Sequence, residues 1–256
     1  MNMTASTELP TYGDRWQETL NWQPSPSQQA IFQQLYAEVL AANQQFNLTR
    51  ITEPSDFWEK HLWDSLNGLA PWLTPDFSWP LPELLRSPQL RVIDIGTGAG
   101  FPGLPAAIAR PDWQVTLLDS TQKKIRFLKT LAESLQLNNV KGLASRAETV
   151  GHQRHQRQKF HVALVRAVGS ASTCAEYALP LLQVGGVAVL YRGQWSAADT
   201  EALAPALELM GGAIAHIQPG VTPLTQGQRH CLYLQKTEPT PLDLPRPVGI
   251  PAKLPL

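Results

Sequence analysis

A chain of 256 residues is long enough for one α/β domain with an N-terminal extension and a sizeable buried core. Its 21 basic and 21 acidic residues cancel, which excludes an overall attraction to nucleic acid and leaves only local basic patches for such a contact. The two isolated cysteines lack metal-ligand spacing and no apolar run reaches the roughly 20 residues of a membrane span, so we expect a cytoplasmic protein without a metal site or membrane segment.

The first third of the chain predicts a mostly helical region. Residues 1–24 are polar and turn-rich, and we expect them to be loosely ordered. Apolar residues then recur with a helical period, which predicts a helix over 27–46 with Ser27 as its N-cap. A second helix is expected over 54–73. Residues 74–89 contain four prolines and are typical of a linker.

From residue 90 on, strands and helices alternate, which predicts an α/β fold with a doubly wound, mostly parallel sheet of seven strands and right-handed crossovers. The predicted strands are 90–95, 114–118, 140–144, 161–165, 186–191, and an antiparallel edge of 213–218 and 229–236. The predicted helices are 103–110, 121–136, 171–183 and 197–210. Residues 237–256 contain six prolines and predict an extended tail rather than a packed element. These patterns divide the chain into 1–24, a helical cap with linker over 25–89, a main domain over 90–236, and the tail.

The most informative stretch, residues 92–103, reads V-I-D-I-G-T-G-A-G-F-P-G. An apolar strand carries Asp94 near its end, glycines follow at three alternate positions, and Pro102 lies where a helix begins. A strand, a glycine turn and a helix start together form a ledge at which a ligand can contact bare backbone.

Two ligand classes use such a ledge. The pattern Gly98-x-Gly100-x-x-Gly103 matches the dinucleotide fingerprint, with Asp119 near the offset expected of a ribose ligand. The longer pattern Asp94-x-Gly96-x-Gly98-x-Gly100 matches the glycine motif of class I S-adenosyl-L-methionine (SAM) methyltransferases, in which the acid helps to hold the amino-acid end of the ligand. We favour the second interpretation because it accounts for the acid and all three glycines.

Several further stretches, taken in order, resemble the RsmG (GidB) family of 16S rRNA guanine-N7 methyltransferases over roughly residues 27–256. The glycine motif has the family's form G-T-G-x-G-F-P-G-x-P, and the proline-rich C-terminus is similar to that of Gram-positive and cyanobacterial members. The other matching stretches are Asn47-Leu48-Thr49, Lys60 to Ser65, Asp119 to Leu128, Arg146-Ala147-Glu148, Val165-Arg166-Ala167 and Arg229-His230.

The resemblance implies a monomeric enzyme that transfers a methyl group from SAM to N7 of one guanine in 16S rRNA, in the loop near the decoding centre, either as naked RNA or in the 30S subunit. Guanine N7 has a free lone pair and carries no proton, so the reaction needs alignment of the reacting atoms rather than a general base. Arg192-Gly193 departs from the Lys-Gly that the family usually has at this place, and Arg is a planar fork where Lys is a point charge.

The motif and the resemblance together assign roles to individual residues. The cofactor is expected to contact Asp94, Gly96, Gly98, Gly100, Phe101, Asp119, Ser120, Thr121, Ala147, Glu148 and Arg166. Contacts with RNA are expected from His61, Asp64, Lys123, Arg126, Arg146, Arg192 and Arg229. Arg166 and Arg192 are the candidates for a catalytic or substrate-positioning role.

Plainer interpretations stay open for several of these residues. Asp119 also fits a helix cap. His61, Asp64 and Ser65 are three and four residues apart, so they fit a hydrogen-bonded core network as well as a polar patch at the site. At the level of function, a methyltransferase for a small molecule and a nucleotide-binding module without methyl transfer remain the alternatives.

Overall fold

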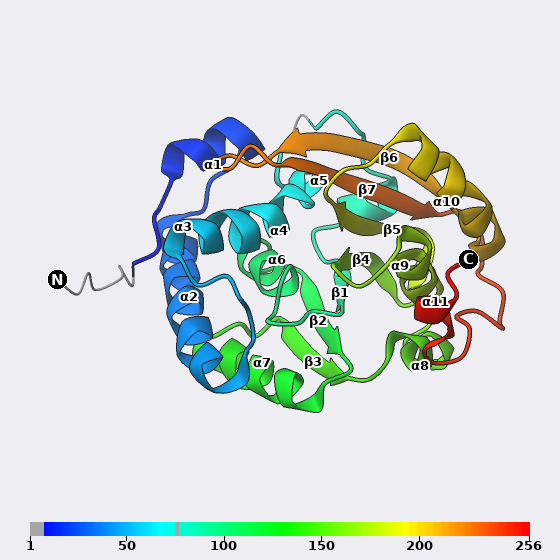
Figure 1. Cartoon of the computed structure of the whole chain (residues 1–256), viewed down its shortest axis with the longest axis horizontal. Helices are drawn as coiled ribbons and strands as arrows, with labels where there is room; N and C mark the ends of the chain where they lie inside the picture. The colour runs from blue at the N-terminus through cyan, green and yellow to red at the C-terminus, as the bar shows by residue number, and fades with distance from the viewer. Residues whose placement is uncertain (1–7, 75–76) are drawn as a thin grey trace.

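The computed structural model describes residues 8–74 and 77–256, without the side chain of Phe46 (Figure 1). Within this part of the chain, seven strands form one sheet in the order β3-β2-β1-β4-β5-β7-β6. All neighbours are parallel except that β7 runs antiparallel to β5 and β6, which confirms the predicted α/β fold and its antiparallel edge. The strands are β1 (Arg91–Ile95), β2 (Gln114–Asp119), β3 (Val140–Ala144), β4 (Phe160–Arg166), β5 (Leu182–Arg192), β6 (Gly212–Val221) and β7 (Gln228–Lys236).

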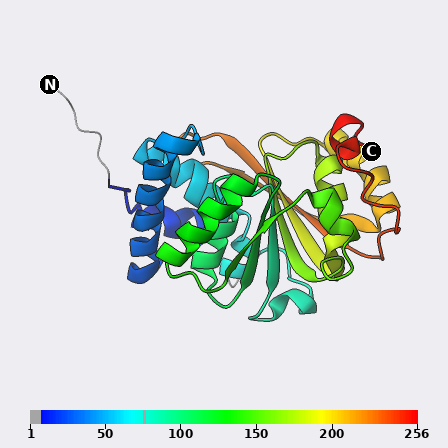
Figure 2. The same cartoon turned by 90° about the horizontal axis from the view of Figure 1, so that it is seen from below.

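Helices cover both faces of the sheet because the central strands are apolar on both sides. In β1, Val92 belongs to one hydrophobic core and Ile93 to the other, as the alternation of side chains along a strand requires. Figure 2 shows the sheet between these two layers of helices. The helices of the main domain are α6 (Gly103–Ala109) and α7 (Gln122–Ser134) in the first layer, and α8 (Ala147–His152), α9 (Ala171–Ala178) and α10 (Ala197–Met210) in the second.

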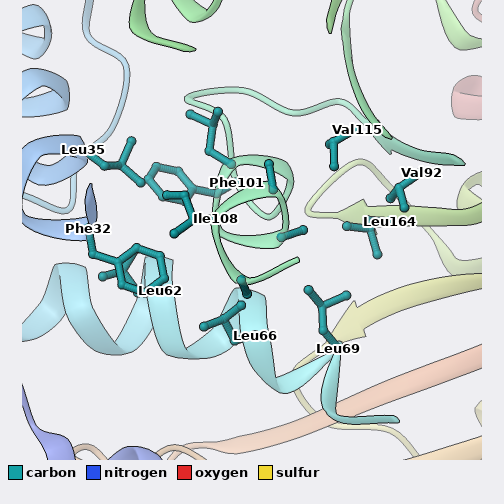
Figure 3. Packing of buried hydrophobic residues seen from close by; sticks show 14 of the residues in the cluster. Phe32, Leu35, Leu62, Leu66, Leu69, Val92, Phe101, Ile108, Val115 and Leu164 are labelled. Atoms are coloured by element: carbon teal, nitrogen blue, oxygen red, sulfur yellow. The ribbon is translucent and has the colours of Figure 1, made fainter. Parts of the chain in front are cut away.

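The N-terminal helices extend the first layer. Figure 3 shows side chains of these helices gathered with those of α6 in one core, among them Leu35, Leu62 and Ile108. No helix among the described residues is long and apolar enough to span a membrane. The N-terminal elements are α1 (Gly13–Leu20), α2 (Pro26–Phe46), α3 (Pro54–Phe57), a π-helical segment (Trp58–Trp63), α4 (Asp64–Asn67) and α5 (Ala70–Leu73).

The expectation of a loosely ordered N-terminus is wrong for residues 13–20, while residues 1–7 lie outside the described part. Helix α1 buries Trp16 completely against Trp58, with ring centroids 4.8 Å apart. The polar composition of this segment concealed the packing, because a single buried indole ring contributes a large apolar area.

The boundaries of the cap helices also differ from the prediction. Ser25, not Ser27, caps α2: its side chain accepts the Gln28 N–H, and the Gln28 side chain accepts the Ser25 N–H in return. The predicted single helix over 54–73 is interrupted at Gly68. There the ring of Tyr191 packs directly against the backbone, and its hydroxyl donates to the Ser65 carbonyl at 2.8 Å.

Two predictions in the second half need correction. The helix expected over 171–183 ends at Ala178, because Pro180 cannot continue a helix, and a short 3₁₀ turn (Leu179–Leu181) leads into β5. The tail is packed rather than merely extended: Leu244 is buried, and a last helical turn, α11 (Ile250–Lys253), lies beside α8 and α9 (Figure 1).

We expect Trp16→Ala to lower the free energy of unfolding by about 3–5 kcal/mol, the cost of emptying a site that a large aromatic side chain fills. Leu242→Ala is the matched control, because Leu242 is 82% exposed and its truncation should change stability little. Urea denaturation of both variants measures the difference. Equal stabilities would show that α1 is not integral to the fold.

Candidate functional site

The turn between β1 and α6 is built on the carboxylate of Asp94. This side chain is fully buried, and its Oδ2 accepts hydrogen bonds from the Thr97 hydroxyl at 2.5 Å and the Gly103 N–H at 2.8 Å. Its Oδ1 has no partner among the described residues. The first oxygen therefore fixes the ends of the turn, and the second is an orphaned acceptor beneath it.

Burial raises the pKa of Asp94 to about 6, against the hydrogen bonds from Thr97 and Gly103, which lower it. A carboxylate that is ionised at neutral pH and lacks a partner for one oxygen is costly to keep in a protein interior. Such a group fits a site in which a positively charged ligand supplies the missing interaction.

The three glycines of the turn have different reasons to be glycine. All have positive φ, but a Cβ on Gly100 would collide with Leu104 of the following helix, so Gly100 serves packing. A Cβ on Gly96 would press against Val168, which lines the site. Above Gly98 there is open space, with only the Gly96 carbonyl within 4 Å of a Cβ. Gly98 is thus the position at which a ligand can approach the backbone.

Asp119, at the end of β2, is tied to this turn. Its Oδ2 accepts the Gly98 N–H at 3.1 Å, and its Oδ1 accepts the Thr121 N–H at 2.8 Å. It therefore satisfies the start of α7, as the plainer interpretation has it, and also braces the glycine turn. Thr121 occupies the N-cap position but makes no side-chain cap.

A pocket of about 280 Å³ opens beside Gly96 and Asp119 at the carboxyl ends of β1 to β4. This is where open α/β sheets bind their ligands. Nine other residues were expected from the sequence to contact a cofactor. Three of them line the pocket, namely Ser120, Ala147 and Glu148. The other six do not line it: Asp94, Gly98, Gly100, Phe101, Thr121 and Arg166. The other lining residues were not expected from the sequence to contact a cofactor; they are Ile95, Leu118, Ser145, Arg146, Val168, Tyr177 and Ala252.

The missed residues carry no signal of their own in the sequence. Tyr177 lies in the last turn of α9, and Ala252 is a small residue in the proline-rich tail. Phe101, in contrast, does not line the pocket. It is buried and stacks on His61 with ring centroids 4.2 Å apart, so its expected contact with the cofactor stays a prediction.

His61 and Asp64 lie in a buried polar network rather than on an exposed RNA-binding surface, and each is 7% exposed. His61 Nε2 lies 2.8 Å from the Thr49 hydroxyl, and burial together with the charge of Arg166 lowers the pKa of His61 to about 3. The imidazole is therefore neutral at physiological pH. Of the two interpretations left open by the sequence, the core network is the one that the structure has.

Arg166 is held by this network on three sides. Its guanidinium donates to the Lys60 carbonyl at 2.9 Å and to Asp64 at 3.0 Å, and it approaches His61 Nδ1 at 3.5 Å. Asp64 accepts a second guanidinium, that of Arg229, at 3.1 Å. One carboxylate of the helical cap thus fixes two arginines that end β4 and begin β7.

The remaining predicted basic residues lie at one edge of the sheet, the edge formed by the carboxyl ends of its parallel strands. Arg192 ends β5 and pairs in register with His230 near the start of antiparallel β7, so both strands bring their side chains to the edge where β4 ends. The Arg192 guanidinium donates to the Gly169 carbonyl at 2.7 Å. Arg146 pairs with Glu148, whereas Lys123 and Arg126 are exposed on the first turns of α7 at the same edge.

When the pH is raised from 4 to 7, the free energy of unfolding of Asp94→Asn should rise by about 3 kcal/mol relative to that of the unchanged protein. This value follows from a difference of roughly two units between the folded and unfolded pKa of Asp94. The folded-state pKa of this acid is raised, so its ionisation penalises the folded state fully above pH 6. The penalty disappears as the pH falls toward 3.8, and asparagine never has it. Urea denaturation of both proteins at the two pH values tests this, and a gap independent of pH contradicts it.

Two solved structures share the fold of this chain at low sequence identity. The antibiotic-resistance methyltransferase Kmr matches with a TM-score of 0.50 at 16% identity, over 58% of this chain and 87% of its own. The branched-chain polyamine synthase from Thermus thermophilus matches with a TM-score of 0.52 at 16% identity, over 70% of this chain and 57% of its own. Two different activities on one architecture show that the fold alone does not decide the reaction.

Sequence similarity is far more specific. A family model described as rRNA small subunit methyltransferase G matches residues 28–231. A protein from Nostoc sp. named ribosomal RNA small subunit methyltransferase G is 53% identical over 250 residues, covering 97% of this chain and 98% of its own. A protein of the same name from Microcystis aeruginosa is 55% identical over 228 residues, covering 89% and 99%. The chain belongs to the rRNA small subunit methyltransferase G (GidB) family.

Proposed function

We propose that this enzyme methylates N7 of one guanine in 16S rRNA, in the loop near the decoding centre. Its methyl donor is SAM, as family membership and the class I methyltransferase fold imply. The observation that carries the proposal is the glycine turn on Asp94 with the adjoining pocket, in a chain that matches its relatives over nearly its whole length.

The residues around the turn fit this cofactor. The orphaned Oδ1 of Asp94 suits the ammonium group of its amino-acid end, and the open backbone at Gly98 allows close approach. Asp119 suits the ribose hydroxyls, and Ala147, which also lines the pocket, suits the adenine. When bound, SAM supplies a methyl group on a positively charged sulfur.

The chain's own residues hold and align the reactants. Methylation at guanine N7 requires no proton acceptor, and His61, whose pKa is about 3, is already neutral and committed to Thr49. Arg166 is engaged by three protein groups, so we assign it a positioning role at the end of β4 rather than a free grip on phosphate. Arg192 is the better candidate for contact with the substrate, because its partly buried guanidinium contacts a carbonyl, that of Gly169, and the sulfur of Cys174 rather than a carboxylate.

The substrate RNA is expected to lie over the edge that carries Lys123, Arg126, Arg146, Arg192 and Arg229. Local clustering at one edge compensates for the zero net charge of the chain, because phosphate contacts act over short, screened distances. We further propose that the enzyme acts as a monomer in the cytoplasm.

Methyl transfer from labelled SAM to naked 16S rRNA, 30S subunits and tRNA tests the proposed target. We expect incorporation into 16S rRNA, either as naked RNA or in the 30S subunit. The methylated site should become cleavable by aniline after borohydride reduction, as 7-methylguanosine does. Incorporation into tRNA alone would refute the rRNA target. Transfer to small molecules without any RNA would favour the alternative of a small-molecule methyltransferase.

Lys123→Ala with Arg126→Ala should weaken binding of 16S rRNA and reduce its salt dependence by a slope of about two, one unit for each lost phosphate contact. Binding of SAM should be unchanged, since neither residue lines the pocket. Lys129→Ala with Lys141→Ala removes the same charge farther from this edge and serves as the control. An unaltered slope in the first variant would place the RNA elsewhere.

A further inference from the structure

The C-terminal tail, residues 237–256, is fastened to the second helix layer by two arginines. Arg157 donates to the backbone carbonyls of Thr240, Pro241 and Leu244, at 2.7 to 2.8 Å. Farther along, Arg246 forms an ion pair at 2.7 Å with Glu176, whose side chain is fully buried. Charge-assisted contacts of this kind hold a segment with little regular secondary structure in one place.

Beyond Arg246 the tail reaches the pocket. The Thr173 hydroxyl of α9 donates to the Pro251 carbonyl at 2.8 Å, and the next residue, Ala252, is exposed and lines the pocket. Figure 1 shows α11 beside α8 and α9, although β5, α10, β6 and β7 separate it from α9 in the sequence. The tail thereby closes a side of the pocket that the strand ends leave open.

Glu148 joins the tail to the pocket. Its Oε1 accepts from the Gly249 N–H at 2.9 Å, from Arg146 at 3.1 Å and from the Tyr177 hydroxyl at 3.3 Å. Three donors on one oxygen leave that atom no capacity for a ligand. Glu148 therefore fastens the tail through Oε1, and because the residue also lines the pocket, its expected contact with the cofactor is left to Oε2.

We propose that residues 245–252 form a wall of the cofactor pocket and determine the affinity for the adenosine part of SAM, with Ala252 against the ligand and Glu148 and Glu176 as the groups that position the wall. This inference rests on the proposed location of the SAM site. It makes the tail a part of the binding site rather than an appendage of the domain.

Calorimetric titration with S-adenosylhomocysteine tests the wall without requiring RNA or turnover. Ala252→Trp places a large side chain in the pocket, and we expect its Kd to rise at least about tenfold. Lys253→Trp is the matched control: it puts the same side chain on the next residue, which is exposed but does not line the pocket, and should bind as the unchanged protein does. Equal affinity of Ala252→Trp and the unchanged protein overturns the inference.

Two further measurements test whether the tail itself forms a wall of the pocket, or whether the new side chain in Ala252→Trp only disturbs the pocket from a distance. Glu176→Met with Arg246→Ala removes the clamp without leaving a buried charge unpaired, and should weaken binding about tenfold while the circular dichroism spectrum stays the same. Amide hydrogen exchange in residues 246–252 should slow on addition of S-adenosylhomocysteine. Exchange that does not change overturns the proposal, even where Ala252→Trp binds weakly.

Gly98→Ala, measured in parallel, distinguishes failure of this inference from failure of the SAM site itself. Its Cβ would enter the open space above the turn. If Gly98→Ala loses affinity while the tail variants keep it, the tail is not a wall but the site stands. If Gly98→Ala and Ala252→Trp both bind normally, the assignment of this pocket to SAM is wrong as well.

Discussion

The buried carboxylate of Asp94 is the constraint on which the site depends. One of its oxygens holds Thr97 and the Gly103 N–H, so the end of β1 and the start of α6 are fixed relative to each other. The glycine turn between them has positive φ at three positions, and without this anchor it would sample many conformations. The cost is an ionised side chain in the interior, visible as a pKa raised to about 6.

The helical cap is part of the same site rather than a separate module. Asp64 pairs with Arg166 of the sheet and with Arg229 of the antiparallel edge. Glu59, also in the cap and fully buried, accepts the backbone N–H groups of Leu224 and Thr225 in the loop before β7. These contacts tie three distant segments together, so the arginines at the mouth of the site are held rigidly in place.

The basic side chains at the carboxyl ends of the parallel strands form an inner and an outer group. The arginines closest to the strand ends are paired with buried acids or carbonyls, which limits their freedom to rearrange around a ligand. Lys123 and Arg126 lie farther out and are exposed. Such a division suits a rigid inner site for alignment and an outer surface for phosphate, where sequence-independent contacts provide affinity.

The sequence alone determined the α/β fold, the family and the glycine turn, because alternating apolar runs and the Asp94 motif are local patterns that a strand–turn–helix unit requires. It also named Asp119 and Ala147 at the pocket. Only the tertiary structure decided the rest. Trp16 packs on Trp58, His61 stacks on Phe101, and Ala252 reaches the pocket, in each case through contacts between residues far apart in the chain. Burial and pairing of that kind depend on the folded arrangement, which no local spacing of residue types encodes.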